Sequence, residues 1–356
     1  MVKNFKCPGC GASMVFKEGT SEMTCPYCGR NVSIKEAERE EKEQRISPDS
    51  ADPGGTGQDE TDGMGQKEGL RTYHCPNCGA EIMTDENTAA TFCSFCGSPT
   101  LIEERLSGVL RPKYLIPFQI DREKAKEMFR KWTRRGVFTP RGFSSSSALD
   151  KVTGMYVPYW LYDYDARVNL DAAATRVHVS VKGDTEYTYT DHYQVYRDVS
   201  AAYDKVPEDA SIQMPDDVME RLEPFHYDQL TPFEMPYLTG FLAEKYNDDQ
   251  EKMRQRAEGR IREYAVRETM NTIEGYAAVN VVRQDVKLTR RNQDYAMLPV
   301  WIMHYQYRNK PYMLMINGQT GKAIGKLPLD YMRVGVGYGI AAAAIFLILT
   351  VFQMLF

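Results

Sequence analysis

The sequence predicts an α+β protein with two tandem small zinc ribbons, a mostly antiparallel sheet domain with helices, and one C-terminal transmembrane helix. Three observations support this prediction. Eight cysteines fall into two identical frames near the N-terminus, period-two alternation dominates the middle of the chain, and the last 23 residues carry no charge. With 356 residues, 42% of them hydrophobic, the chain can bury a core and divide into two or three domains.

The cysteines form four Cys-x-x-Cys pairs, arranged as two frames of the type C-x2-C-x14-C-x2-C. The second frame repeats the first at an offset of 68 residues, which indicates an internal duplication. Four thiolates at this spacing suit one tetrahedral Zn²⁺, and a closed site of this kind is structural. We therefore expect two zinc ions, one per ribbon, with the ligands Cys7, Cys10, Cys25 and Cys28 in the first and Cys75, Cys78, Cys93 and Cys96 in the second.

Other uses of cysteine pairs fit less well. Disulfide bonds need an oxidising compartment, and no signal peptide precedes Cys7. A redox pair needs a single motif in a βαβ setting, and rubredoxin-like iron sites have a longer interval between their knuckles.

A glycine follows the second cysteine of every pair, where a tight turn requires a positive φ: Gly11, Gly29, Gly79 and Gly97.

Composition divides the chain into five segments. Zinc ribbon 1 is expected at 1–34 and zinc ribbon 2 at 72–105. Residues 35–71 between them hold six Lys/Arg and eleven Asp/Glu and are rich in glycine, which predicts a disordered acidic linker with a short helix near its start. An α+β domain is expected at 106–330, and a transmembrane helix at 334–356.

Within the α+β domain, Asp121 is expected to cap a helix over 122–135. A second, charged helix is predicted over 249–273, and an irregular region over 204–247. The remaining expectations are a strand at 115–120, a polar loop at 144–147, strands across 154–200 and a hairpin at 311–326. Val177, Val179 and Val181 alternate with polar residues, which predicts a sheet with one buried and one solvated face.

The pattern P-x-W-x3-Y-x2-R occurs at 158–167 and again at 299–308, an offset of 141 residues. It predicts two related β units within the domain. The five histidines are scattered, and the sequence has no nucleophile elbow and no glycine-rich phosphate loop. No catalytic residue is therefore predicted, and the expectation is a protein that is not an enzyme.

The 23 uncharged residues at the C-terminus would form a helix about 34 Å long, enough to span a hydrocarbon core of about 30 Å. Lys322, Lys326 and Arg333 precede this segment, so the positive-inside rule places the N-terminal bulk in the cytoplasm. We expect a single-pass protein of the cell membrane. Cytoplasmic thiols stay reduced, which again favours zinc over disulfides.

The frames Cys7-Pro-Gly-Cys-Gly, Cys25-Pro-Tyr-Cys-Gly, Cys75-Pro-Asn-Cys-Gly and Cys93-Ser-Phe-Cys-Gly resemble zinc ribbons of the TFIIB type. Together with Ile116-Pro-Phe118, Val157-Pro-Tyr-Trp160 and Ile316-Asn-Gly-Gln-Thr-Gly321, they make the whole chain resemble a group of bacterial zinc-ribbon membrane proteins. Some members of that group carry labels borrowed from primosomal helicases. This chain has no Walker A motif, so the resemblance implies metal binding and no helicase activity.

The expected function is that of a tail-anchored adaptor or regulatory protein, with two ribbons on a flexible tether that dock a cytoplasmic protein partner. A nucleic-acid-linked regulator is the alternative, supported by Phe5, Phe16, Phe92 and Phe95 in the ribbons. The charge disfavours it, because residues 71–105 hold two Lys/Arg and five Asp/Glu. The second alternative is a ligand-binding or enzymatic α+β domain built on the tyrosine-rich sheets.

Overall fold

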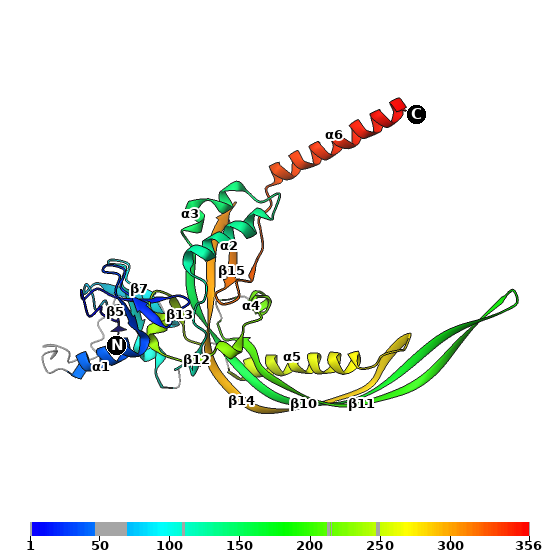
Figure 1. Cartoon of the computed structure of the whole chain (residues 1–356), viewed down its shortest axis with the longest axis horizontal. Coiled ribbons are helices and arrows are strands. Elements are labelled where there is room, and N and C mark those ends of the chain that lie inside the picture. The colour runs from blue at the N-terminus through cyan, green and yellow to red at the C-terminus, as the bar shows by residue number, and fades with distance from the viewer. Residues whose placement is uncertain are drawn as a thin grey trace.

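The computed structural model describes residues 2–46, 70–108, 111–211, 214, 216–246 and 250–355. Figure 1 shows a body that holds the N-terminal units, a long curved arm of strands, and the separate C-terminal helix α6 (Tyr331–Leu355). The arrangement is α+β, as predicted. Residues 334–355 of the predicted membrane segment belong to α6, which is long and apolar enough to cross a bilayer and has none of its apolar stretch buried. Residue 356 lies outside the described residues.

One mixed sheet of eleven described strands runs through the body and the arm. Its centre is formed by β10 (Thr153–Lys182) and β14 (Ala278–Tyr307), which pair antiparallel over most of their length. On one side of β10 lie β11 (Thr185–Asp209) and, in parallel, β13 (Leu242–Glu244). On the other side of the sheet, β14 pairs antiparallel with β15 (Lys310–Asn317), which in turn pairs with β16 (Ala323–Gly325). Strand β14 also pairs in parallel with β9 (Tyr114–Leu115), and β9 pairs with β12 (Thr231–Pro232).

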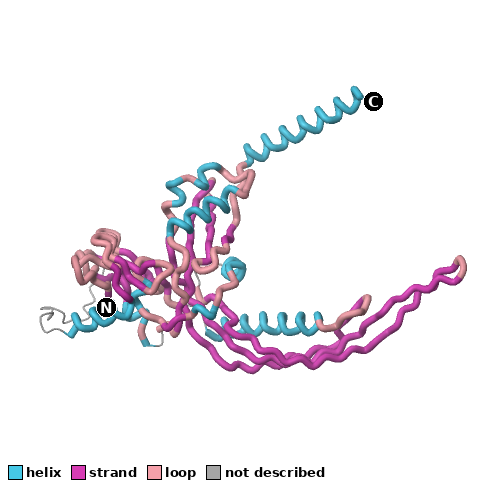
Figure 2. Tube along the Cα trace, viewed as in Figure 1, coloured by secondary structure: helices cyan, strands magenta, loops and turns pink. Residues whose placement is uncertain are grey.

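The arm consists of β10, β11 and β14 with the helix α5 (Gln250–Asn271) along one face (Figure 2). The predicted helix at 249–273 is thus confirmed. Its apolar stripe is buried against alternate residues of β10, because both elements repeat their apolar positions toward the same interface. The buried side chains are Met253, Ala257, Ile261 and Ala265 of α5 and Ala166, Val168, Leu170, Ala172 and Ala174 of β10.

The outer part of the arm contradicts the prediction of a buried face. Beyond the pair Thr175–Ala278, β10 and β11 continue as a two-stranded ribbon to the turn at Gly183 and Asp184. Val179 is 54% exposed and Val181 is 68% exposed. The alternation is present, but neither a third strand nor a helix among the described residues covers this part of the ribbon.

The remaining elements follow the sequence closely in some places and not in others. Helix α2 (Arg122–Arg134) begins where expected, with the carboxylate of Asp121 accepting a hydrogen bond of 2.7 Å from the backbone N–H of Lys124. The predicted hairpin is confirmed as β15 and β16. Of the strand expected at 115–120, only Leu115 is in a strand, β9. The polar loop expected at 144–147 is instead largely part of two short helices, η4 (Arg141–Ser144) and α3 (Ser146–Leu149).

Residues 204–247, predicted to be irregular, contain the end of β11 and several short elements. These are α4 (Asp216–Leu222), η5 (Tyr227–Gln229), β12, η6 (Met235–Leu238) and β13. The predicted pair of β units is wrong. Pro158 and Arg167 lie in one continuous strand, whereas Arg308 lies in the turn after β14, so the two copies of the motif are not equivalent.

The N-terminal units are not tethered modules, which corrects the expectation of free ribbons. Strand β1 (Val2–Lys3) of the first unit pairs with β8 (Pro99–Ile102) of the second, and β7 (Thr88–Phe92) pairs with β8 and β13 of the main sheet. The first unit also contains β2 (Val15–Lys17), β3 (Glu22–Thr24) and β4 (Asn31–Ser33); the second contains β5 (Leu70–His74), β6 (Glu81–Asp85) and η2 (Glu103–Leu106).

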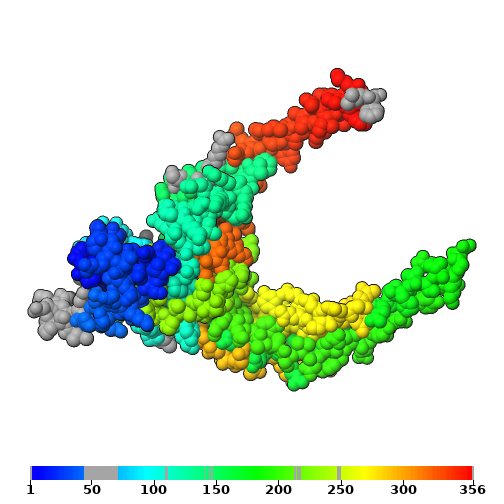
Figure 3. All heavy atoms as spheres, viewed as in Figure 1, coloured from blue at the N-terminus to red at the C-terminus, as the bar shows by residue number. Residues whose placement is uncertain are grey.

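Core packing fixes the first unit to the body, because its buried residues belong to the same hydrophobic cluster as those of the main sheet. In Figure 3 the blue spheres of this unit lie against the spheres of the body. The ring of Phe16 lies 5.1 Å from the ring of Tyr237, and the Phe16 backbone N–H donates to Thr239 at 2.9 Å. The predicted linker therefore begins later than residue 35, because α1 (Ile34–Ile46) is an ordered helix that contacts η6. Residues 47–69 of that linker lie outside the described residues.

Candidate metal centres

The four cysteine pairs form four similar turns. In the first, the backbone N–H of Gly11 donates to the Cys7 carbonyl at 2.9 Å, and the Cys7 N–H donates to the Ala12 carbonyl at 2.8 Å. All four following glycines have a φ between +70° and +74°, as predicted from their position. A β-carbon is unfavourable in this conformation, so glycine lets each turn close and aim two sulfurs at one point.

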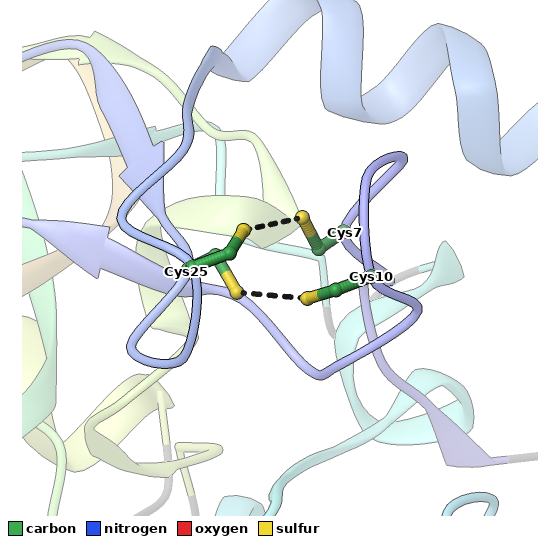
Figure 4. Close-up of side chains that lie close together, drawn as sticks. Cys7, Cys10 and Cys25 are labelled. Atoms are coloured by element: carbon green, nitrogen blue, oxygen red, sulfur yellow. Dashed lines mark hydrogen bonds between the residues drawn. The ribbon is translucent and has the colours of Figure 1, made fainter.

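The structure brings the eight cysteines into the two groups that the frames predict, with all ligand sulfurs of a group within 4.8 Å of one another. In the first group, Cys7 Sγ lies 3.6 Å from Cys28 Sγ, and Cys10 Sγ lies 3.5 Å from Cys25 Sγ (Figure 4). The corresponding separations in the second group are 3.7 Å and 3.8 Å. A disulfide bond has a sulfur separation near 2.05 Å, so all eight thiols are free.

Hydrogen bonds favour the thiolate form at some of the sulfurs. The backbone N–H of Cys28 lowers the pKa of Cys25 to about 6, and the Ser98 hydroxyl lowers the pKa of Cys96 to about 6. At Cys10 and Cys78, a backbone donor is outweighed by burial and by hydrogen bonds with the neighbouring thiols, which raise the pKa to about 12. Because the thiolate is the form that binds metal, the donors prepare Cys25 and Cys96 as ligands.

The duplicated units differ at residues beside the sulfurs. Asn77 Nδ2 donates to Cys96 Sγ at 3.6 Å, where the first unit has Gly9, and Ser98 makes the shorter contacts. Ser98 is buried, and its hydroxyl oxygen lies 3.1 Å from Cys96 Sγ and 3.4 Å from Cys75 Sγ. The equivalent residue of the first unit is Arg30, whose guanidinium packs over Gly9. The second group therefore has a hydroxyl partner for two of its sulfurs that the first group lacks.

A groove of about 360 Å³ runs between the two units. It is lined by one cysteine of each group, Cys10 and Cys96, and by Tyr27, which is 81% exposed. Phe95 stands at the equivalent position of the second unit and is 76% exposed. Each unit thus presents an aromatic ring on the knuckle that ends in its last ligand.

The four aromatic residues that supported nucleic-acid binding differ in their exposure to solvent. Phe5 and Phe16 are only 2% exposed and belong to the hydrophobic core. Phe92 lines the groove, and only Phe95 is strongly exposed. Two of the four rings are therefore unable to stack on a base.

A second cavity, of about 310 Å³, lies where β7, β13, β10 and β14 meet. Its floor is apolar, and the carboxyl groups of Asp85 and Glu244 line it. Burial raises the pKa of Glu244, whose carboxylate accepts a hydrogen bond of 2.7 Å from Ser211.

The tyrosines of the sheets, on which a ligand surface was expected, are divided between the two strands. Those of β11 are partly exposed: Tyr187, Tyr189 and Tyr193. Those of β10 are buried in the core: Tyr156, Tyr159, Tyr162 and Tyr164.

Sequence reasoning missed a buried ionic cluster at the base of the arm. Arg260 of α5 donates to Glu208 at 3.1 Å and to Glu223 at 3.1 Å. Glu208 is 1% exposed, and burial outweighs its arginine partners and raises its pKa to about 7. The arginine-rich helix was the sequence feature that could have indicated this cluster. Arg260 does not belong to the apolar stripe of that helix, so the sequence favoured a solvent-exposed side chain.

Comparison with known proteins gives a relative that matches over nearly its full length. No family model matches the chain, and no solved structure matches it. The relative is described as the uncharacterised protein YdjG of Bacillus subtilis strain 168 and is 37% identical over 355 residues. The alignment covers 100% of this chain and 98% of the relative. The chain belongs to the family of YdjG.

Proposed function

We propose that the protein is a single-pass membrane adaptor whose two zinc-bound ribbons dock a cytoplasmic protein partner. The observation that supports this most directly is the groove between the cysteine groups, which is lined by the exposed ring of Tyr27. Phe95, at the equivalent position of the second unit, presents a second exposed ring beside Cys96. Tyrosine and phenylalanine are among the residues that are enriched at protein interfaces.

Zinc is the metal that the sulfur geometry supports. Four sulfurs at about 2.3 Å from a tetrahedral ion lie about 3.8 Å from one another. The measured separations of 3.5–3.8 Å are close to this value. Four cysteines per ion leave no open position, so the metal acts in folding, as the resemblance to bacterial zinc-ribbon proteins also implies.

The anchor is residues 334–356, with the N-terminal bulk in the cytoplasm. Support comes from α6, whose large apolar side chains are exposed along its length, for example Ile340 at 66% and Phe352 at 60%. Such a helix cannot remain in water without association, and a lipid bilayer satisfies it over its full length. A cytoplasmic location also keeps the eight thiols reduced.

The anchored body would present its groove to proteins rather than to nucleic acid. Each zinc ion with four thiolates carries a net charge of about −2, so two negative centres border the groove. A phosphate backbone would be repelled there. A protein segment can supply N–H donors to the sulfurs and apolar side chains to Tyr27 and Phe95.

Affinity purification from detergent-solubilised membranes tests the adaptor. The intact chain is compared with a Tyr27→Ala/Phe95→Ala double variant, which removes the exposed rings and keeps all eight ligands. Tyr196→Ala serves as control, because this arm residue is also exposed, at 58%. We expect a protein that co-purifies with the intact chain and the control and is lost from the double variant. Equal recovery from all three, or no partner from any, contradicts the proposal.

A further inference from the structure

The first turns of α6 are fixed to a short loop at 136–140, which follows α2. The backbone N–H of Asp330 donates to the Phe138 carbonyl at 2.8 Å, and the Arg333 guanidinium donates to the Thr139 carbonyl. A β-carbon on Gly337 would come within 2.8 Å of the Phe138 ring, so this glycine lets the loop touch the helix. The loop therefore lies where α6 leaves the body.

Two arginines meet beside this loop. Arg134, near the end of α2, and Arg333, in α6, line one cavity of about 250 Å³ together with Gly136 and Thr139. Among the residues that the structure describes, no carboxylate forms an ion pair with either guanidinium. The nearby Asp330 carboxylate accepts from the backbone N–H of Met332 at 3.1 Å and thus caps α6.

Further cations lie on the neighbouring elements. Arg135, directly after α2, lines a separate cavity and has no ion pair in the described part of the chain. The Arg308 guanidinium lies 5.6 Å from the ring centroid of Tyr331, at the start of α6. The whole chain has a net charge of −5, so this local excess of positive charge is not a reflection of the composition. It is suited to an anion with a delocalised charge, which arginine binds better than lysine does.

Exposed apolar side chains adjoin the arginines. Val137 is 76% exposed at the tip of the loop, and Met332 is 78% exposed at the start of α6. Tyr331, 68% exposed, belongs to the residue type that collects at the boundary between headgroups and hydrocarbon. A cavity with arginines next to exposed apolar groups matches the layered chemistry of a phospholipid, with a charged headgroup above its acyl chains.

We propose that an anionic phospholipid of the inner leaflet binds here, with its phosphate between Arg134 and Arg333 and with Val137 and Phe138 at the level of the upper acyl chains. This site rests on the proposed membrane anchor. It would fix the rotation and depth of the body at the membrane, because the loop, α2 and α6 would all contact one lipid.

The test uses the full chain in bilayers of phosphatidylcholine and phosphatidylglycerol at equal amounts. Native mass spectrometry then counts the two lipids that remain bound when the protein is released. We expect phosphatidylglycerol to be retained over phosphatidylcholine, and Arg134→Gln to reduce this preference about fivefold, the effect of one basic residue near an anionic surface. Arg122→Gln, at the other end of α2, changes the charge equally and should leave the preference unchanged.

The outcomes separate the anchor from the lipid site. If the intact chain does not co-float with the vesicles after an alkaline wash, the anchor is wrong and the lipid site fails with it. If the chain co-floats but Arg134→Gln and Arg122→Gln show the same lipid preference as the intact chain, or lose it equally, only the lipid site is wrong. Loss of bound phosphatidylglycerol on addition of excess inorganic phosphate would identify a site for soluble anions and also overturn the lipid assignment.

Discussion

Ser98 is the residue that distinguishes the two cysteine groups most clearly. Its buried hydroxyl contacts two ligand sulfurs, whereas the first unit has Arg30 at this position and no equivalent contact. Hydrogen bonds to metal ligands typically change metal affinity by 10–100-fold. The two sites should therefore respond differently to a change at residue 98.

We predict that Ser98→Ala weakens zinc binding at the second group by about tenfold and leaves the first group unchanged. Competition with a chromophoric chelator measures both sites as separate phases of zinc release. Ser94→Ala is the matched control, because this serine is exposed and has no described contact with a sulfur. Equal affinities in the intact chain and in Ser98→Ala would show that the hydroxyl does not support the metal.

Glu208 gives a prediction about pH. Folding raises the pKa of its carboxyl from about 4.5 to about 7, so the folded chain keeps a proton that the unfolded chain has lost. The resulting stabilisation is complete below the unfolded pKa and disappears as the pH rises through 7. The protein should therefore be more stable at pH 6 than at pH 8, with Glu208 contributing about 1 kcal/mol of the difference.

Thermal unfolding of the detergent-solubilised chain at the two pH values measures this effect. Glu208→Gln keeps the size of the side chain and removes the titration, so the difference in Tm between pH 6 and pH 8 should shrink. Glu263→Gln, a change at an exposed residue of α5, the helix that supplies the arginine partners of Glu208, should leave the difference unchanged. An undiminished pH dependence in Glu208→Gln would refute the assignment.

At the scale of elements, the arm divides into a packed inner part and an outer ribbon. The inner part buries alternate residues of β10 against α5, whereas the outer ribbon from Val177 to Thr190 leaves its side chains largely exposed. An isolated two-stranded ribbon contributes little to stability in water. Folding should depend on the inner part alone.

We predict that replacement of residues 177–190 by Asn-Gly leaves the Tm of the protein within about 2 °C of the intact value. The design is possible because Arg176 and Asp191 form a cross-strand pair, and Asn-Gly closes a two-residue hairpin between them. Leu170→Asp, which places a charge in the buried interface with α5, should instead lower the Tm strongly. A large loss of stability in the deletion variant would mean that the outer ribbon belongs to the core.

These elements also show what the sequence can and cannot predict. Helices α2 and α5 were predictable, because a cap at Asp121 and a stripe at Met253, Ala257 and Ile261 are local signals. The cysteine groups were predictable because two residues between cysteines place both sulfurs of a pair on one tight turn, and the two pairs of a frame then meet. The exposed valines of the ribbon were not, because alternation records the pleat of a strand and does not reveal whether another element covers it.

At the scale of the whole molecule, the missing information was long-range pairing. Nothing in Val2 and Lys3 indicates that they pair with Leu101 and Ile102, and nothing in Phe16 identifies Tyr237 as its neighbour. The glycine-rich composition of 35–71 therefore suggested free ribbons, whereas both units are parts of the body. The buried pair of Arg260 and Glu208 escaped prediction for the same reason, since the two residues are 52 positions apart.

The contacts of the first unit with the body lead to a prediction that a freely tethered ribbon would not fulfil. If a protease site is placed within residues 47–69 and cut, the N-terminal piece should stay bound to the rest of the chain, because β1 pairs with β8 and Phe16 packs in the core. Size-exclusion chromatography of the cleaved, detergent-solubilised protein should show both pieces in one peak. Separation of the pieces would restore the tethered arrangement. An Asp substitution at Phe16 before cleavage should cause such separation.

The proposed function requires that this chain binds zinc and that α6 holds it in the membrane. Its most direct test is the zinc content per chain of the tagged, full-length protein, purified from membranes that have been washed with alkaline carbonate. The account predicts that the chain stays with the membranes and carries two zinc ions, falling to one in a Cys93→Ser/Cys96→Ser variant. Release of the chain by the wash, or a content well below two zinc ions, would contradict it.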